Sequence, residues 1–450
     1  MKEWVVATLG GADKPVLVAT LVLVVLAGSA VAGVLEARRP PAGRVLVAAA
    51  GTLAAIAAVT RAGASALAVL PSAAAIAAGI LALAVLLPTG APTGTPGRRR
   101  FLAAVATWVL GGAAAAIAGN ALGAGARSAV GAIGRVRLPR PVRPLPPLPA
   151  GAAFAVPGLT PLVTPNPDFY RVDIALAPPA VDPAGWMLEI TGMVARPLRL
   201  SFRELLDRDL VAARLTLACV SNPIGGGLVG SATWLGLPVR QLLREAGPAA
   251  DADMVLSTGA DGFTAGTPLP ALLDGRNALL AVGMNGVPLP QEHGFPVRLV
   301  VPGLYGYVSA TKWLTRLEVT RFDRAEGYWT PRGWSAKGPV KLSSRVDVPR
   351  DGAVVQAGEV VVAGMAWEQH VGIARVEVAL DDGPWQEAEL STAVTDDWWR
   401  QWRWRWAAER GEHRLRVRAT DRRGRPQVTR VADVAPNGAT GLHTIHVRVG

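Results

Sequence analysis

Four long apolar stretches without a charged side chain fill most of the first 126 residues, and they constrain the fold more than any other feature. They are Pro15–Leu35, Val45–Thr60, Leu67–Leu87 and Phe101–Ala126. A helix needs roughly 20 apolar residues to cross the hydrocarbon core of a bilayer. Buried helices of a soluble bundle are the alternative, but successive runs without any polar face disfavour it. The pattern predicts four transmembrane helices, at about residues 15–35, 44–62, 66–87 and 101–125.

The positive charge of the chain is concentrated in this apolar third. Residues 1–150 hold 14 Lys and Arg against 3 Asp and Glu, whereas the remaining 300 residues hold 32 against 31. A nucleic-acid-binding protein would carry its surplus charge on a folded outer domain, so this distribution favours a membrane protein with basic loops. We therefore expect membrane lipid as a partner and no nucleic acid.

Arginines in the loops predict the orientation of the helices. Arg38, Arg39 and Arg44 lie between the first and second helices, and Arg98–Arg100 lie between the third and fourth, while the second loop has only Arg61. Positively charged loops stay in the cytoplasm, so the chain after the fourth helix is expected outside. We predict a multi-pass protein of the cell membrane whose remaining domains face the extracytoplasmic side.

The same arginines allow a second interpretation. Arg98-Arg99-Arg100-Phe101-Leu102 resembles the core of a twin-arginine export signal, which carries proteins that have already folded. Cytoplasmic loop charges of the ordinary kind would look the same. Both interpretations stay open at this point.

Composition divides the rest of the chain into a linker and two domains. The stretch LPRPVRPLPPLP at 138–149 predicts an extended, semi-rigid segment. We place the membrane region at 1–130, the linker at 131–155 and the domains at 156–342 and 343–450. The first domain alternates strand-like runs with helix-like segments, which is typical of an α+β fold. The strands are expected near 186–191, 214–218 and 297–301, and the helices near 202–208, 238–245 and 269–273.

The last hundred residues predict an all-β domain. Strand-like runs recur at 354–363, 374–380, 400–406 and 412–419 with turns between them, as in an immunoglobulin-like sandwich. The tract WWRQWRWRW at 398–406 could stack on nucleic acid or carbohydrate. Its alternation from Trp402 to Trp406 instead places tryptophan on one strand face and arginine on the other, which favours packing in a core or an interface.

A single cysteine, Cys219, limits the metal chemistry. It excludes an intramolecular disulfide, a four-cysteine zinc or iron–sulfur site and a C-x-x-C-H haem attachment. No histidine precedes His293, so the predicted membrane helices cannot hold a haem between two histidines. Cys219 ends a strand-like run and enters the glycine-rich loop VSNPIGGGLVG, where a bulky group could approach the backbone closely. A thiolate ligand for a redox metal and a small buried apolar residue are both open interpretations.

A second group of polar residues lies between positions 293 and 312. His293, Arg298 and Lys312 supply one neutral donor and two cations within 20 residues, separated by a strand and a turn rich in Gly and Tyr. They could converge on a phosphate, to which arginine presents a fork and lysine a point charge. Solvated surface charges are the alternative.

Together these segments resemble the sulfite oxidase family of molybdopterin-dependent oxidoreductases. The resemblance runs from about residue 160 to 450 and is carried by TPNPDFYR (164–171), LTLACVSN (215–222), ATWLGLPVRQLL (232–243) and, most specifically, HGFPVRLVVPGLYGYVSATKWL (293–314). It implies a molybdopterin-binding α+β domain, a C-terminal immunoglobulin-like domain that forms homodimers, and a molybdenum–molybdopterin cofactor. The sequence contains no haem or iron–sulfur motif, so we expect neither haem nor an iron–sulfur cluster. Residues 1–150 are outside it.

The resemblance also implies roles for particular residues. Cys219 falls on the cysteine that binds molybdenum through sulfur, and His293 and Arg298 fall on the residues that contact the pterin and its phosphate. Lys312 falls on the lysine before the Trp-Leu pair, and the neighbouring Ser309 would offer backbone or hydroxyl contacts. Phe169 and Arg171 fall in the early cofactor-facing segment, and Arg171 could also meet an anionic substrate.

Two departures from the family pattern affect the substrate site. Sulfite oxidases follow the cysteine with glycine, asparagine and paired arginines that hold sulfite, but here Val220-Ser221-Asn222-Pro223 follows. The active-site tyrosine expected after Arg332 is replaced by Trp334. We therefore expect a preserved metal site with a rewritten substrate pocket.

These features predict a membrane-anchored enzyme that transfers an oxygen atom at a Cys-ligated molybdenum centre, either oxidising a sulfur compound or reducing an S- or N-oxide. A separate carrier, cytochrome or quinone, would exchange the electrons. The alternative is a non-enzymatic surface or assembly protein that kept the fold, left the Cys219 pocket empty and associates through its tryptophan-rich sandwich.

Overall fold

Two units make up the chain in the computed structural model, Met1–Gly123 and Ala124–Gly450. The structure describes residues 13–59, 69–87, 131, 133–175 and 178–450. The predicted fourth membrane helix at 101–125 and the arginines of the predicted export signal at 98–100 lie outside the described residues.

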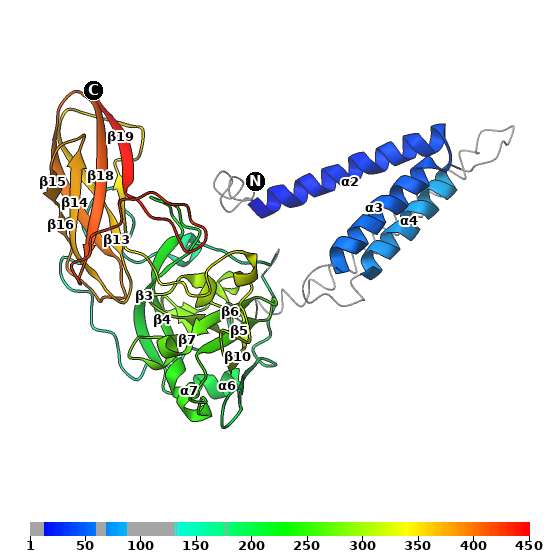
Figure 1. The fold of residues 1–450 in the computed structure, drawn as a ribbon, viewed down its shortest axis with the longest axis horizontal. Helices are drawn as coiled ribbons and strands as arrows, with labels where there is room; N and C mark the ends of the chain where they lie inside the picture. The colour runs from blue at the N-terminus through cyan, green and yellow to red at the C-terminus, as the bar shows by residue number, and fades with distance from the viewer. Residues whose placement is uncertain (1–12, 60–68, 88–130, 132, 176–177) are drawn as a thin grey trace. The chain divides into compact units, whose positions relative to one another are not determined.

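Helices follow the first three apolar stretches of the N-terminal unit. They are α2 (Asp13–Arg38), α3 (Ala42–Val59) and α4 (Leu70–Leu86), and α3 packs against both of the others (Figure 1). Several large apolar side chains are more than half exposed, among them Leu23, Leu53 and Leu81. Among the described helices, Ala42–Val59 is long and apolar enough to span a bilayer, and Ser72–Ala84 is a shorter apolar segment. Four membrane-spanning helices therefore remain a prediction.

The predicted α+β domain contains two separate sheets. The first has the order β2-β1-β10-β5-β6, and within it only β1 and β10 run parallel. Its strands are β1 (Met187–Gly192), β2 (Leu198–Ser201), β5 (Met254–Gly259), β6 (Thr264–Pro268) and β10 (Leu314–Thr320). Helix α6 (Phe202–Leu206) follows β2 and starts with a capping box, in which the Ser201 hydroxyl accepts from the amide of Glu204 and the Glu204 carboxylate accepts from the amide of Ser201.

The second sheet carries the cysteine. Its order is β3-β4-β7-β8, with β9 paired to the other part of β7. The strands are β3 (Val211–Ala218), β4 (Val229–Pro238), β7 (Leu279–Met284), β8 (Val287–Pro288) and β9 (Arg298–Val300), and α7 (Val239–Ala246) and α8 (Leu269–Leu273) lie between them in sequence. Asn285 and Gly286 join β7 to β8 and both have positive φ, as a two-residue type I′ hairpin requires. Every residue of β7 is buried, so this sheet is covered on both faces.

The proline-rich segment lies on this domain rather than standing free of it. Residues 138–149 form neither helix nor strand, as expected. However, the amide of Val142 donates to the carbonyl of Leu210, and Arg214 on β3 donates to the carbonyl of Pro146 at 2.7 Å. These contacts hold the segment against the second sheet, which the composition alone did not predict.

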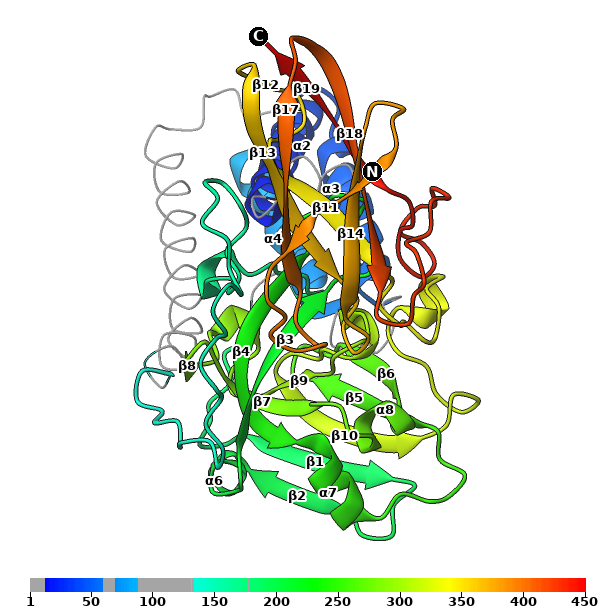
Figure 2. The same cartoon turned by 90° about the vertical axis from the view of Figure 1, so that its left-hand side faces the viewer.

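A β-sandwich follows from residue 343 (Figure 2). One sheet has the order β11-β13-β17-β16 and the other β12-β19-β18-β14-β15. The first contains β11 (Ser343–Val348), β13 (Gly358–Trp367), β16 (Glu389–Leu390) and β17 (Arg400–Ala408). The second contains β12 (Ala353–Val355), β14 (Ile373–Leu380), β15 (Trp385–Glu387), β18 (Gly411–Asp421) and β19 (His443–Val449). The largely β character expected for this region is confirmed, while dimerisation through it stays a prediction.

Most tryptophans of the 398–406 tract are buried. Trp402 and Trp406 lie in the core of the sandwich. Trp398 and Trp399 are buried against the α+β domain, where the Trp399 indole N–H donates to the carbonyl of Leu162 and its amide donates to the hydroxyl of Thr216, both at 2.8 Å. The structure therefore favours packing over stacking on an external ligand, and Trp399 ties the sandwich to strand β3.

Candidate functional site

A cavity of about 110 Å³ lies beside the carboxyl end of β3. It brings together five of the residues selected from the sequence, although they are up to 143 positions apart: Phe169, Cys219, His293, Arg298 and Lys312. The two polar groups identified separately along the chain therefore share one site.

Cys219 is fixed where β3 ends. Its amide donates to the carbonyl of Leu228 at 2.9 Å, and Asn222 closes the intervening loop by accepting from the amide of Leu228 at 2.8 Å. The thiol is buried, and burial raises its pKa, while hydrogen bonds from Ser221 and Val220 oppose that rise. The sulfur is thus a thiol without a metal, and a cation that binds it would displace the proton.

Arg298 is a buried cation that pairs with no carboxylate among the residues that the structure describes. It lies on β9, is 6% exposed, and donates only to the carbonyls of His293 at 3.2 Å and Ala310 at 3.4 Å. Its guanidinium carbon lies 5.2 Å from the Trp234 ring centroid, and its Nε has no hydrogen-bond partner. Burial lowers its pKa to about 10. A guanidinium in this state is disposed to bind an anion.

Lys312 enters the cavity from the opposite end of the same motif. Its Nζ donates to Asp173 Oδ2 at 2.8 Å and to the carbonyl of Glu292 at 3.2 Å, and lies 4.7 Å from the Trp313 ring centroid. Burial lowers its pKa to about 8, and the Asp173 carboxylate opposes that effect. The amine therefore remains largely charged at neutral pH.

His293 lines the same cavity as the two cations and is neutral. Its Nε2 lies 2.9 Å from the backbone carbonyl of Asn166, which fixes that nitrogen as a donor. Burial lowers its pKa to about 4, and Arg298 adds to the effect. The next residue, Gly294, has φ of +107°, and a Cβ there would come within 3.1 Å of Arg298 and Lys312. A glycine is needed for this turn, which holds the three side chains together.

Two predicted residues are placed differently from the other five. Ser309 is fully buried, and its hydroxyl donates to the carbonyls of Leu304 and Tyr305, so it shapes a loop and does not line the cavity. Arg171 is exposed at the edge of the site and is also absent from the lining. It is close enough to Lys312 to help lower the pKa of that amine.

Several lining residues carried no usable signal in the sequence. Tyr170 stacks on Phe169 at 5.3 Å between ring centroids, and burial and the neighbouring Cys219 raise its pKa above the usual range. Its position between two selected residues was the one available clue. Asp261 and Phe263 come from the turn between β5 and β6, and burial raises the pKa of the Asp261 carboxyl.

An aromatic wall closes one side of the cavity. Trp334, the residue found in place of the expected tyrosine, lies 5.9 Å from Tyr307 and 6.4 Å from Trp329 between ring centroids. The Tyr307 hydroxyl donates to the carbonyl of Ser335 at 2.7 Å and so holds the Trp334 segment in place. The site therefore combines a thiol and buried cations with an apolar, water-excluding wall.

Comparisons with known proteins agree with this arrangement. The family described as "Oxidoreductase molybdopterin binding domain" matches residues 175–329. The chain is 32% identical over 271 residues to the mitochondrial sulfite oxidase of Mus musculus, covering 51% of this chain and 49% of that one. It is 32% identical over 157 residues to the uncharacterized oxidoreductase YuiH of Bacillus subtilis, covering 35% of this chain and 76% of that one.

One solved structure shares the fold. The sulfane dehydrogenase SoxCD of Paracoccus pantotrophus superposes with a TM-score of 0.57 at 24% sequence identity, covering 64% of this chain and 81% of that one. The chain spans about half the length of the mammalian sulfite oxidases it matches. The family match at 175–329 includes Cys219, His293, Arg298 and Lys312 of the cavity.

Proposed function

Because the chain belongs to the sulfite oxidase family of molybdopterin-dependent oxidoreductases, we propose that it is a membrane-anchored oxygen-atom-transfer enzyme whose molybdenum is bound by Cys219. The observation that carries this proposal is the state of Arg298. Within the described part of the chain, this buried guanidinium has no carboxylate partner and no hydrogen-bond partner at Nε, and it shares a cavity with a buried thiol. Buried charges without a partner are strongly unfavourable, so the site is built for an anionic ligand.

The donor set fits a pterin cofactor that carries a phosphate. Arg298 offers a fork for phosphate oxygens, Lys312 a point charge, and His293 a neutral ring held in one tautomer. Among the residues that the structure describes, no group of three or more His, Cys, Asp and Glu could hold a metal ion alone. A metal at Cys219 would therefore take further ligands from a non-protein group, such as dithiolene sulfurs.

The cofactor, when bound, supplies two-electron chemistry in which an oxygen atom is exchanged with the substrate. The chain contributes binding, orientation and exclusion of water. Cys219 is held by the β3–β4 loop, and Trp329 and Trp334 form an apolar wall of the cavity. Tyr170 keeps its proton on Oη because burial disfavours the phenolate, so it can donate a hydrogen bond into the cavity.

The residues after the cysteine bear on the substrate. Val220 and Ser221 line the cavity where the family has residues leading into paired arginines. Without those guanidiniums the pocket has little to hold a sulfite dianion. We propose oxidation of another sulfur compound or reduction of an S- or N-oxide as the reaction, with electrons exchanged with a separate carrier.

The membrane anchor and the outward orientation are part of the same proposal. Helix Ala42–Val59 and the apolar surfaces of its neighbours support an anchor, and the distribution of loop arginines supports an extracytoplasmic catalytic domain. Fusion of alkaline phosphatase after residue 450 tests the orientation. High phosphatase activity in whole cells is expected, and activity seen only with a cytoplasmic reporter would refute it.

Metal analysis tests the central assignment. The purified full chain should contain about one molybdenum and one pterin per chain, and Cys219→Ser should reduce bound molybdenum to background. Ser231→Ala, at a buried hydroxyl that bonds Thr216 outside the cavity, is the matched control and should keep the metal. A folded chain that turns over without molybdenum, or a Cys219→Ser protein with full metal content, would refute the proposal.

A further inference from the structure

A basic groove lies between the oxidoreductase domain and the β-sandwich. Its volume is about 550 Å³. Five cationic side chains line it against the two carboxylates of Glu368 and Asp421: Arg276, Lys337, Lys341, Arg423 and Arg425. The oxidoreductase domain and sandwich together are close to electrically balanced, so this groove is a local concentration of positive charge.

Only part of this positive charge is neutralised within the groove. Arg425 pairs with Asp421 at 2.6 Å and with Glu368 at 2.9 Å. Lys341 donates to Asn437 and to a backbone carbonyl. Among the described residues, Lys337 and Arg423 form no ion pair, and both are exposed on the groove. These two cations are available to an external anion.

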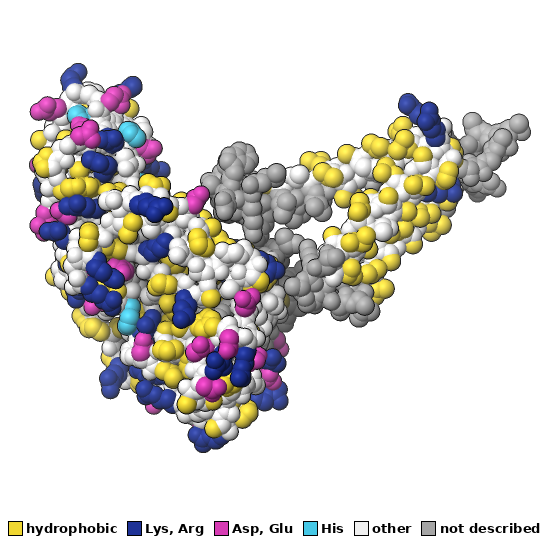
Figure 3. Space-filling model, in the orientation of Figure 1, with side chains coloured by type: hydrophobic (Ala, Val, Ile, Leu, Met, Phe, Trp, Pro, Cys, Tyr) yellow, Lys and Arg dark blue, Asp and Glu magenta, His cyan; other side chains and the backbone are white. Residues whose placement is uncertain are grey.

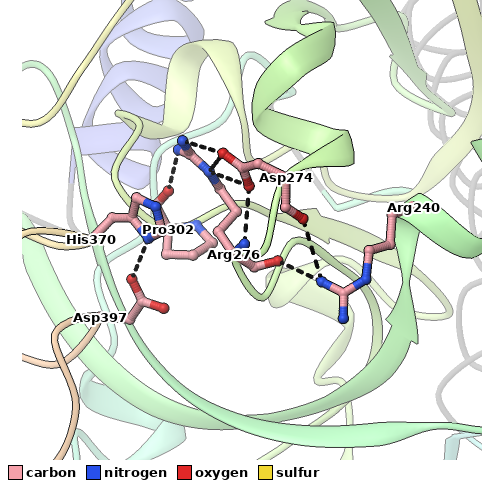
Figure 4. Close-up of polar contacts among 6 residues, drawn as sticks. All are labelled: Arg240, Asp274, Arg276, Pro302, His370 and Asp397. Atoms are coloured by element: carbon pink, nitrogen blue, oxygen red, sulfur yellow. Dashed lines mark hydrogen bonds and ion pairs between the residues drawn. The ribbon is translucent and has the colours of Figure 1, made fainter.

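The wall on the oxidoreductase side is held rigidly (Figure 4). Arg276 forms a bidentate pair with Asp274 at 2.8–3.0 Å and donates to the carbonyl of Pro302 at 3.1 Å, and Arg240 donates to the backbone of the same turn. His370 lies beside this turn, with its Nδ1 3.4 Å from Asp397 Oδ1. A fixed wall lowers the entropic penalty for a partner that binds there.

The groove and the cofactor cavity share one loop. Gly303 and Leu304 line the groove, whereas Gly306 and Tyr307 line the cavity. Tyr305, between them, accepts from the amide of Lys341 at 3.3 Å, and the pKa of its phenol is raised by burial and by nearby Cys219. The segment 303–307 therefore contributes to both the groove and the cavity that contains the proposed metal ligand.

We propose that this groove docks an acidic protein that exchanges electrons with the metal site. Figure 3 shows Lys and Arg side chains near the boundary between the sandwich and the oxidoreductase domain, with acidic side chains among them. An acidic protein would match the unpaired cations of the groove, and complementary charge accelerates and orients docking. The inference rests on the proposed function, because it assigns a partner to that site.

The electron balance requires such a partner. In the oxidising direction, a substrate and one water yield the oxygenated product, two protons and two electrons. Two molecules of a one-electron carrier each take one electron, and the protons pass to solvent. In the reducing direction, the oxygenated substrate takes up two protons and two electrons from two carrier molecules and yields the deoxygenated product and one water.

Charge-matched probes test the docking site. Cytochrome c is basic, and succinylation of its lysines makes the same haem protein acidic. The full chain in detergent should bind succinylated cytochrome c at least about tenfold more tightly than native cytochrome c at low ionic strength. Lys337→Glu/Arg423→Glu should weaken that binding by about tenfold or more, while turnover with small dyes such as methyl viologen or ferricyanide stays unchanged.

Arg199→Glu/Arg203→Glu is the matched control. It changes the net charge equally, at β2 and α6, and should alter binding less than twofold. Equal binding of both cytochromes, or equal loss in the control, would overturn the inference. A third outcome would also overturn it. If phosphate abolished binding of succinylated cytochrome c and chloride at equal ionic strength did not, the groove would be a site for small anions. If the wild-type protein showed no turnover with the small dyes, the proposed function would be refuted. The comparison of cytochrome binding would still test the docking site independently.

Discussion

Two arginines of the unit Ala124–Gly450 are buried to nearly the same extent, yet their surroundings differ. Arg298 in the cavity is 6% exposed and Arg345 on β11 of the sandwich is 8% exposed. Arg345 bonds Asp347 at 2.6 Å through Nε, the carbonyl of Gly226 through Nη1 and the hydroxyl of Thr160 through Nη2. Arg298 bonds two carbonyls and, as far as the structure describes the chain, no acid.

The difference distinguishes a structural charge from a binding charge. Asp347 already neutralises Arg345 within the fold, so removing Arg345 leaves a buried carboxylate without its ion pair. Arg298 has no such neighbour, and its burial is unfavourable until an anion arrives. The metal-free chain can be prepared in a host that makes no molybdopterin. Its unfolding free energy should fall more when Arg345 is replaced than when Arg298 is replaced.

Arg345→Met should have the largest effect. It leaves the Asp347 carboxylate, itself 8% exposed, without its ion pair, so the unfolding free energy should fall by about 3–5 kcal/mol. Denaturant titration at pH 7 measures the loss. The double variant Arg345→Met/Asp347→Asn should recover at least half of it, and a single-variant loss below about 1 kcal/mol would remove the contrast between the two arginines.

His293→Gln should change the pH dependence of stability. Burial lowers the pKa of His293 from 6.5 to about 4, so between these values the unfolded chain binds more protons than the folded one. The wild-type chain should therefore lose up to about 3 kcal/mol between pH 6.5 and 4 at this residue. Glutamine keeps an N–H for the Asn166 carbonyl and does not titrate. Between pH 7 and pH 4, the unfolding free energy of the variant should therefore fall less than that of the wild type. Parallel profiles of unfolding free energy against pH would contradict this.

Lys312→Met should reduce the unfolding free energy by an amount between those of the Arg345 and Arg298 variants. The amine has a carboxylate partner in Asp173, but it also pays for its burial with a lowered pKa. We expect a loss of about 2 kcal/mol at pH 7, because a buried carboxylate loses an ion pair while a desolvated ammonium is removed. Lys312→Arg keeps the charge and should lose less. A loss as large as that of Arg345→Met would make Lys312 a structural charge rather than a binding one.

Arg298→Met should have the smallest effect on stability and a large effect on the metal. Loss of two carbonyl hydrogen bonds and relief of guanidinium burial should nearly cancel, leaving the unfolding free energy within about 1 kcal/mol of wild type. Bound molybdenum, measured by mass spectrometry in protein from a cofactor-producing host, should fall at least about tenfold. Arg298→Lys, which lacks the fork, should restore it only in part. Full metal retention in Arg298→Met would show that the cofactor does not depend on this guanidinium.

The sequence predicted the part of the site that is contiguous in the chain. His293, Arg298 and Lys312 lie in one motif, and Cys219 is the only cysteine, so each could be selected without knowing the fold. Asp261 reaches the cavity from a β-turn with no motif around it, and only the pairing of β5 with β10 brings it near Lys312. Long-range strand pairing of this kind leaves little trace in a single sequence.

Local patterns predicted local elements well and their pairing poorly. Helices α6, α7 and α8 begin within about one residue of the expected positions, because caps, prolines and apolar spacing act within a turn. Strands β5 and β6 were not predicted, since MVLSTG and TAGTP are short and contain small and polar residues. Their stability comes from partners distant in sequence. The same limit applies to Arg298 and Arg345, whose difference depends on which acid lies nearby.

The tie between Trp399 and Thr216 bears on how this protein could be re-engineered or have evolved. Strand β3 presents Cys219 three positions after Thr216, and the sandwich supplies both an amide donor to that threonine and, from Asp397, a carbonyl acceptor for its backbone. Grafting a foreign C-terminal domain, or truncating before residue 343, would strip the strand of these partners. The oxidoreductase domain and the sandwich therefore depend on each other structurally. We expect that recombination between relatives has kept the two domains together.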